Sequence, residues 1–148
     1  MPGSKETISS EETITRYLKN RFHVRRRNKK LQIKAFSPLF DATENIYIIS
    51  VFRTSFLLSE DEIWDLVDSL NIKDMGKCEF CLQLDVSTIQ SEEMDVVADD
   101  SKGQHKLHAH LIFSNDDEKR NDEINFLFNY CKNKLKLRNS ESEQMDNS

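Results

Sequence analysis

Glycine is scarce in this chain, with three among 148 residues, and proline occurs only twice. The loops that cradle phosphates in nucleotide-binding enzymes need several glycines close together, so a Walker loop or a GxGxxG fingerprint is excluded. The HExxH and GxSxG patterns are missing as well. The sequence therefore offers none of the common motifs by which an enzyme is identified.

Long apolar runs are also lacking. None approaches the roughly 18 residues of a membrane-spanning helix, and the polar start MPGSKET has no secretion signal. Three cysteines are an odd number, which argues for reduced thiols rather than a disulfide framework. We therefore expect a cytoplasmic protein without a membrane partner.

Charge is present in quantity but unevenly placed. Residues 1–35 contain ten Lys or Arg and three Glu, a net charge of about +7, and the remaining residues carry about −12. The densest basic stretch, residues 19–34, includes Arg25, Arg26, Arg27, Lys29 and Lys30. Such side chains neutralise backbone phosphates, and they also dock on acidic protein surfaces. The stretch predicts a basic N-terminal lobe that binds a protein or a nucleic acid.

Hydrophobic periodicity predicts a single α+β domain in the order α-β-β-α-β-β-β-α, with a mixed or mainly antiparallel sheet of four to five strands and about three helices. Helices are expected from Ser9 into the arginine run, over 59–70 and over 117–137, and strands over 31–35, 46–52, 78–86, 94–98 and 106–113. Residues 1–8 are expected to be a flexible N-terminus, 9–137 the domain and 138–148 a disordered polar tail.

Two helix starts are marked by capping boxes, Ser9 with Glu12 and Ser59 with Glu62. Residues 46–52 are apolar on both faces, which is typical of a central strand. The apolar stripe of the helix over 59–70 contains the single tryptophan, Trp64. We expect Trp64 to pack against that strand.

Three segments, SVFRTS at 50–55, LSEDEIW at 58–64 and LHAHLIF at 107–113, resemble the motifs of a family of small bacterial proteins whose function is not established. The family pattern reads Ser-Val-Phe-Arg-Thr, Leu-Ser-x-x-Glu-Ile-Trp and His-Ala-Asn-Ile. The chain departs from it at His110, where the pattern has Asn, and at Val67, where it tends to Gly. The resemblance implies a single-domain cytosolic protein and carries no activity.

His108 and His110 form the sharpest local feature. Residues at i and i+2 of a strand share a face, and two imidazoles on one face can bind a divalent metal. One hypothesis is a single-strand nuclease of the HUH class, in which Tyr130 on the later helix would attack the phosphodiester. Only twenty residues separate His110 from Tyr130, which is short for that fold. The other interpretation is a pair of polar residues on a solvated face.

Cys81 and Asp85 would share a sheet face with the two histidines if their strands were neighbours, and the four residues could then hold zinc or act in general acid/base work. A polar solvated face is again the alternative. Cys78 and Cys81 have the CxxC spacing of a metal knuckle, but they fall in an alternating strand, so we expect Cys78 in the core.

Taken together, these patterns favour a small binding or accessory module, not an enzyme, that needs no cofactor. Its basic lobe would contact a protein partner or a nucleic acid. The alternative is a metal-dependent phosphodiesterase or nuclease that uses His108 and His110.

Overall fold

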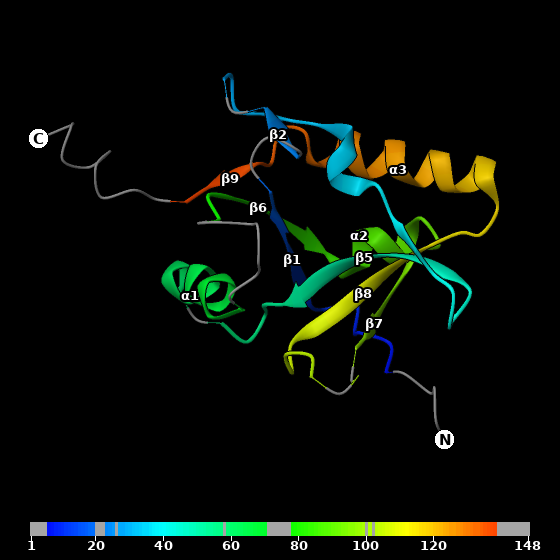
Figure 1. The fold of residues 1–148 in the computed structure, drawn as a ribbon, viewed down its shortest axis with the longest axis horizontal. Helices are drawn as coiled ribbons and strands as arrows, with labels where there is room; N and C mark the ends of the chain where they lie inside the picture. The colour runs from blue at the N-terminus through cyan, green and yellow to red at the C-terminus, as the bar shows by residue number, and fades with distance from the viewer. Residues whose placement is uncertain are drawn as a thin grey trace, which may run out of the picture.

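The computed structural model describes residues 6–19, 23–25, 27–57, 59–70, 78–99, 101 and 103–138. They form one α+β domain around an antiparallel sheet (Figure 1). Within these residues the sheet has seven strands in the order β7-β8-β5-β1-β6-β9, and β4 also pairs with β5. The fold class is confirmed, and the strands outnumber the four to five expected.

The sheet strands are β1 (Thr13–Leu18), β4 (Leu39–Asp41), β5 (Ile46–Arg53), β6 (Phe80–Asp85), β7 (Asp95–Ala98), β8 (His108–Phe113) and β9 (Lys136–Leu137). A separate two-stranded hairpin consists of β2 (Val24–Arg25) and β3 (Lys30–Leu31). The helices are α1 (Glu60–Leu70), α2 (Val86–Ser91), α3 (Asp117–Cys131) and the 3-10 helix η1 (Ile33–Phe36).

The two faces of the sheet belong to two separate cores. The first core joins the sheet to α2, α3 and η1 through residues such as Ile89, Leu127 and Phe36. The second core lies under α1, where Trp64 packs with Tyr17 and Phe52. Trp64 is 3% exposed, and the ring centroids of Trp64 and Tyr17 lie 6.5 Å apart. The predicted burial of Trp64 against the central strand is confirmed.

The capping box at the start of α1 is confirmed as well. The Ser59 backbone N–H donates to Glu62 Oε1 over 3.0 Å, and the Glu62 N–H donates to Ser59 Oγ over 3.3 Å. These reciprocal bonds satisfy two backbone donors that would otherwise have no partner at the helix start.

The helix predicted from Ser9 is wrong, because its residues form the strand β1. Ile14 and Leu18 are four apart, a spacing that fits one face of a helix and also one face of a strand. In the sheet both lie in the first core, while Tyr17 faces the second. The Glu12 carboxylate does not complete a capping box: it accepts hydrogen bonds from Arg53 Nε and Nη2 over 2.9 and 2.7 Å.

Other predicted bounds also shift. The last helix ends at Cys131 instead of residue 137, and Lys136–Leu137 turn back to pair with β6. The strand expected over 31–35 is a short strand followed by η1, and the strand expected over 78–86 gives way to α2 at Val86. In each case pairing with a distant strand or packing on the sheet outweighs local periodicity.

The N-terminal segment joins the sheet before Ser9. The Ile8 N–H donates to the Val96 carbonyl and the Ala98 N–H to the Glu6 carbonyl, each over 2.8 Å, and Ile8 is 1% exposed. Residues 1–5 and 139–148, where most of the predicted flexible terminus and tail fall, lie outside the described residues, as does Arg26. Across the part of the chain that is described, no helix is long and apolar enough to cross a membrane.

Candidate functional site

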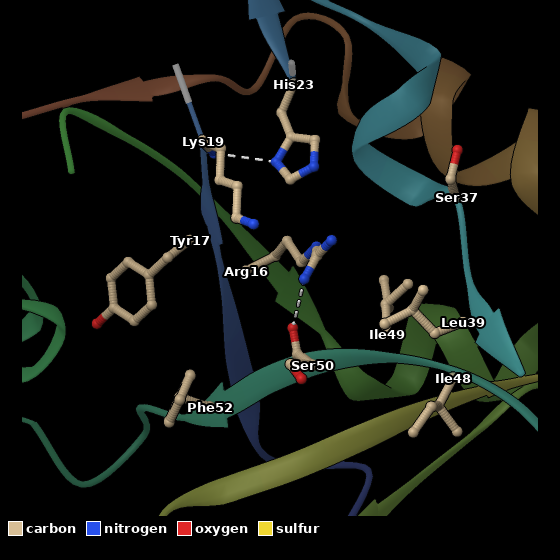
Figure 2. Close-up of a pocket in the computed structure, with 10 residues that line it drawn as sticks. All are labelled: Arg16, Tyr17, Lys19, His23, Ser37, Leu39, Ile48, Ile49, Ser50 and Phe52. Carbon is tan, nitrogen blue, oxygen red and sulfur yellow. Dashed lines mark hydrogen bonds between the residues drawn. The ribbon is translucent and has the colours of Figure 1, made fainter. Parts of the chain in front are cut away.

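A pocket opens where the sheet has a gap beside β5. One edge of β5 pairs with β8 along Tyr47–Phe52. The other edge pairs with β4 up to Ile48 and with β1 from Phe52 onward, so the stretch between them has no strand partner on that side among the residues that the structure describes. The gap holds a cavity of about 370 Å³, lined by Arg16, Tyr17, Lys19, His23, Ser37, Leu39, Ile48, Ile49, Ser50 and Phe52 (Figure 2).

The Arg16 guanidinium bridges this gap. Its Nη1 donates to the Ser50 carbonyl over 3.0 Å, and its Nε and Nη2 donate to the Ala35 carbonyl over 3.2 and 3.1 Å. Burial lowers the pKa of Arg16 to about 10, so the group still carries its charge at neutral pH. None of the described carboxylates forms an ion pair with it. A half-buried cation with only neutral acceptors among the described residues favours an anionic ligand.

Two further basic side chains, Lys19 and His23, lie beside Arg16 (Figure 2). His23 Nδ1 accepts the Lys19 backbone N–H over 2.9 Å, so Nε2 carries the proton of the neutral ring and is a donor. Burial, followed by the positive charges of Arg16 and Lys19, lowers the pKa of His23 to about 4. The described residues of the lining include no Asp or Glu, and the pocket therefore presents donors suited to a phosphate or a carboxylate.

The shifted His23 predicts a specific pH dependence of stability. Between pH 6.5 and about 4, His23 is largely protonated in the unfolded state and largely neutral in the folded state. The free energy of unfolding therefore falls as the pH falls. In His23→Gln that fall should be smaller by roughly 1–2 kcal/mol, a value discounted for the partial exposure of the ring. Urea unfolding at pH about 7 and about 4.5 measures the difference, and equal falls in both proteins would contradict the prediction.

The basic hairpin stands next to this pocket, because His23 directly precedes β2. Val24 and Leu31 pair with each other and are buried. Arg25 pairs with Lys30, and both are exposed. Like charges opposite each other in a hairpin are destabilising, so an anion bound across Arg25 and Lys30 would relieve their repulsion.

Arg27 and Lys29, in the turn of the hairpin, are exposed too. Lys29 has a positive φ of 55° there. The described basic residues of the sequence prediction, Arg25, Arg27, Lys29 and Lys30, are therefore gathered at one exposed hairpin.

A second polar cluster lies on β8 and at the end of β7. His108 Nδ1 and Asp99 Oδ2 are 2.7 Å apart, and His110 Nε2 lies 3.4 Å from the same oxygen. The three residues are buried, with His108 6%, His110 8% and Asp99 5% exposed. The interpretation of the two histidines as residues of a solvated face is therefore wrong: the rings pack against each other, and His108 also packs on Phe52.

The Asp99 carboxylate is held in its ionised form. Burial by itself would raise its pKa, but hydrogen bonds from Ser101 and His108, together with nearby His110, outweigh that effect and lower the pKa to about 2. The Ser101 N–H donates to Asp99 Oδ1 over 3.0 Å and fixes the orientation of the carboxylate. Oδ2 is left to face the two imidazoles.

The structure does not bring Cys81 and Asp85 to the histidines. They share the sheet face, but β1 and β5 separate β6 from β8, which places them three strand spacings away, roughly 14 Å. Burial raises the pKa of Cys81 to about 12, so its thiol is protonated in the second core. Cys78 lies in the same core, as predicted.

Tyr130, the proposed nuclease nucleophile, is also distant from His108 and His110. It lies on α3, where its ring stacks on Phe126 with centroids 5.8 Å apart. α3 packs on the first core, on the face of the sheet opposite to the histidines. The geometry of the HUH mechanism is therefore not assembled here.

The sequence prediction missed Asp99 and the pocket residue Arg16, whereas Lys19 and His23 fall within the basic stretch over 19–34 that it singled out. Asp99 had a signal, because it is the first polar residue after a short apolar strand that could pair with the His108–His110 strand. Arg16 had none, since its segment was assigned to a helix. Comparison with protein-family models, with curated proteins and with solved structures finds no match.

Proposed function

We propose that the protein is a binding module whose basic lobe, residues 16–34, binds the phosphates of single-stranded nucleic acid. The observation that carries this proposal is the pocket around Arg16. It holds a half-buried guanidinium with no anionic partner among the described residues, flanked by Lys19 and His23. These are the donors that a backbone phosphate accepts.

The shape of the pocket supports a single strand in preference to a duplex. Its volume of about 370 Å³ is at the small end for ligand pockets, and Leu39, Ile48 and Phe52 give it an apolar side. A nucleotide can enter such a recess only if it is unstacked, as in single strands and loops. The hairpin with Arg25, Arg27 and Lys30 would then contact the neighbouring phosphates.

Buried thiols agree with a reducing compartment for this activity. Cys78, Cys81 and Cys131 are free and buried, and burial raises the pKa of each. We propose on this ground that the binding takes place in the cytoplasm.

The proposal predicts salt-dependent binding of labelled single-stranded DNA and RNA. Arg25→Ala/Arg27→Ala/Lys30→Ala should weaken binding at least about tenfold at roughly 50 mM salt. The slope of log affinity against log salt should fall by about 2, because each lost single-strand phosphate contact removes about 0.7. Fluorescence anisotropy at about 50 and 200 mM salt measures both quantities.

Lys106→Ala/Lys119→Ala/Lys132→Ala is the matched control, since it removes the same charge from exposed positions outside the lobe. It should keep most of the affinity. Equal losses of affinity in the two triple variants would show that binding depends on net charge alone, and would contradict the proposal. Displacement of the oligonucleotide by polyglutamate at equal charge concentration would point to an acidic protein partner in its place.

A further inference from the structure

We infer that Asp99, His108 and His110 form a binding site for a divalent transition metal of the zinc class. The three residues each offer one ligand atom, and these atoms all lie within 4.8 Å of one another. Two imidazoles and one carboxylate are a ligand set of known zinc and non-haem iron sites. The inference is independent of the anion pocket, because none of the three ligand residues lines that pocket.

The backbone fixes this arrangement. His108 and His110 lie at i and i+2 of β8 and so share a face. Val97 pairs with His110 and Ala98 with Ala109, which brings Asp99 opposite His108, and the Asp99 N–H donates to the His108 carbonyl over 2.9 Å. Sites on rigid strands hold their ligands more precisely than sites on loops.

Both imidazole nitrogens converge on one oxygen, Asp99 Oδ2, at 2.7 and 3.4 Å. Ligands of tetrahedral zinc with bonds near 2.0–2.1 Å are about 3.3 Å apart. The His110–Asp99 separation already fits, and His108 would move about 0.6 Å away from the carboxylate when the metal replaces their hydrogen bond. The two imidazole nitrogens lie within 4.8 Å of each other and would adjust to the same spacing. The adjustment is within the reach of side-chain rotation.

The surroundings of Asp99 also suit a cation. Its side chain is 4% exposed, and its ion-pair partners among the described residues are the two imidazoles, with no Lys or Arg that would compete with a metal. The Ser101 N–H on Oδ1 supplies the kind of outer hydrogen bond that orients a carboxylate ligand.

Access to the cluster is provided by a second cavity of about 290 Å³, lined in part by His108, His105 and Ser50. Three protein ligands leave one position of a tetrahedron for water or another oxygen donor, as in zinc sites that are not purely structural. The metal would therefore be exchangeable through this cavity.

The test is a titration of the chelator-treated full chain with Zn²⁺, followed by calorimetry and by thermal unfolding. We expect one Zn²⁺ per chain, a higher melting temperature, and an affinity lowered at least about 100-fold by Asp99→Asn, more than the loss of an outer hydrogen bond produces. Asp85→Asn is the matched control, because Asp85 lies exposed on the same sheet face, and it should bind within about twofold of the wild type. No bound Zn²⁺, or equal affinity in Asp99→Asn and wild type, overturns the inference.

A second readout needs no variant and so remains decisive if Asp99→Asn fails to fold. Co²⁺ bound to the wild type should give the visible absorption of a four- or five-coordinate nitrogen and oxygen site without a thiolate charge-transfer band. A thiolate band would show that Cys78 or Cys81 binds the metal, and would overturn the assignment. His110→Gln, which keeps a hydrogen-bond donor, should abolish the Co²⁺ spectrum.

Discussion

Trp64→Ala is expected to lower the free energy of unfolding by about 3–5 kcal/mol, the usual cost of truncating a buried aromatic side chain. Trp64 is 3% exposed in the second core, and α1 has no other aromatic residue with which to fill the space. The total stability of a domain is only about 5–15 kcal/mol, so the variant should be unfolded or close to it at room temperature. Urea unfolding followed by circular dichroism measures the loss.

Two companion variants separate packing from other effects. Trp64 Nε1 has no hydrogen-bond partner among the described residues, so Trp64→Phe should cost only the reduced volume, about 1–2 kcal/mol. Phe56, 60% exposed, should tolerate Ala within about 0.5 kcal/mol. Red-shifted, easily quenched emission of Trp64 in the native protein would contradict its burial and place a partner surface on α1.

Arg16→Met should affect stability and binding together. Loss of the guanidinium removes three hydrogen bonds to the Ala35 and Ser50 carbonyls. The Ala35 carbonyl, left without partners in a partly buried position, costs about 1–3 kcal/mol, whereas the exposed Ser50 carbonyl can bond to water. The same change removes the central cation of the pocket, so oligonucleotide affinity should drop at least about tenfold. Arg16→Lys keeps the charge but cannot reproduce the forked contacts of the guanidinium. Its stability and its oligonucleotide affinity should therefore lie between those of the wild type and those of Arg16→Met.

Arg120→Met is the control that separates the loss of stability from the loss of oligonucleotide binding. Arg120 likewise donates to backbone carbonyls, those of Ser114 and Asn115, and its side chain is 14% exposed. It lies outside the pocket lining, so its loss should lower stability while leaving binding unchanged. Thermal unfolding in phosphate and in chloride at equal ionic strength adds a direct readout. Phosphate should raise the melting temperature of the wild type and not of Arg16→Met, and equal shifts would remove Arg16 from the anion site.

Elements whose signal is local and strong were predictable. The apolar residues of β5 and β8, the capping box of α1 and the start of α3 at residue 117 determine their own structure, because each pattern fits one period and one set of caps. The clustering of basic residues was equally predictable, since counting charges along the chain requires no knowledge of the fold. The sequence by itself thus determined the α+β class, the burial of Trp64 and the existence of a basic lobe.

The tertiary structure decided which strands and which side chains are neighbours. Residues 13–18 satisfy a helical and a strand period at Ile14 and Leu18, and only their pairing with β5 and β6 selects the strand. Asp99 reaches His108 through the register of β7 on β8, whereas β1 and β5 keep Cys81 away from it. The pocket exists because β4 and β1 share one edge of β5 and leave a gap that Arg16 bridges. Strand neighbours are set by contacts between segments far apart in the chain, and a local pattern does not contain them.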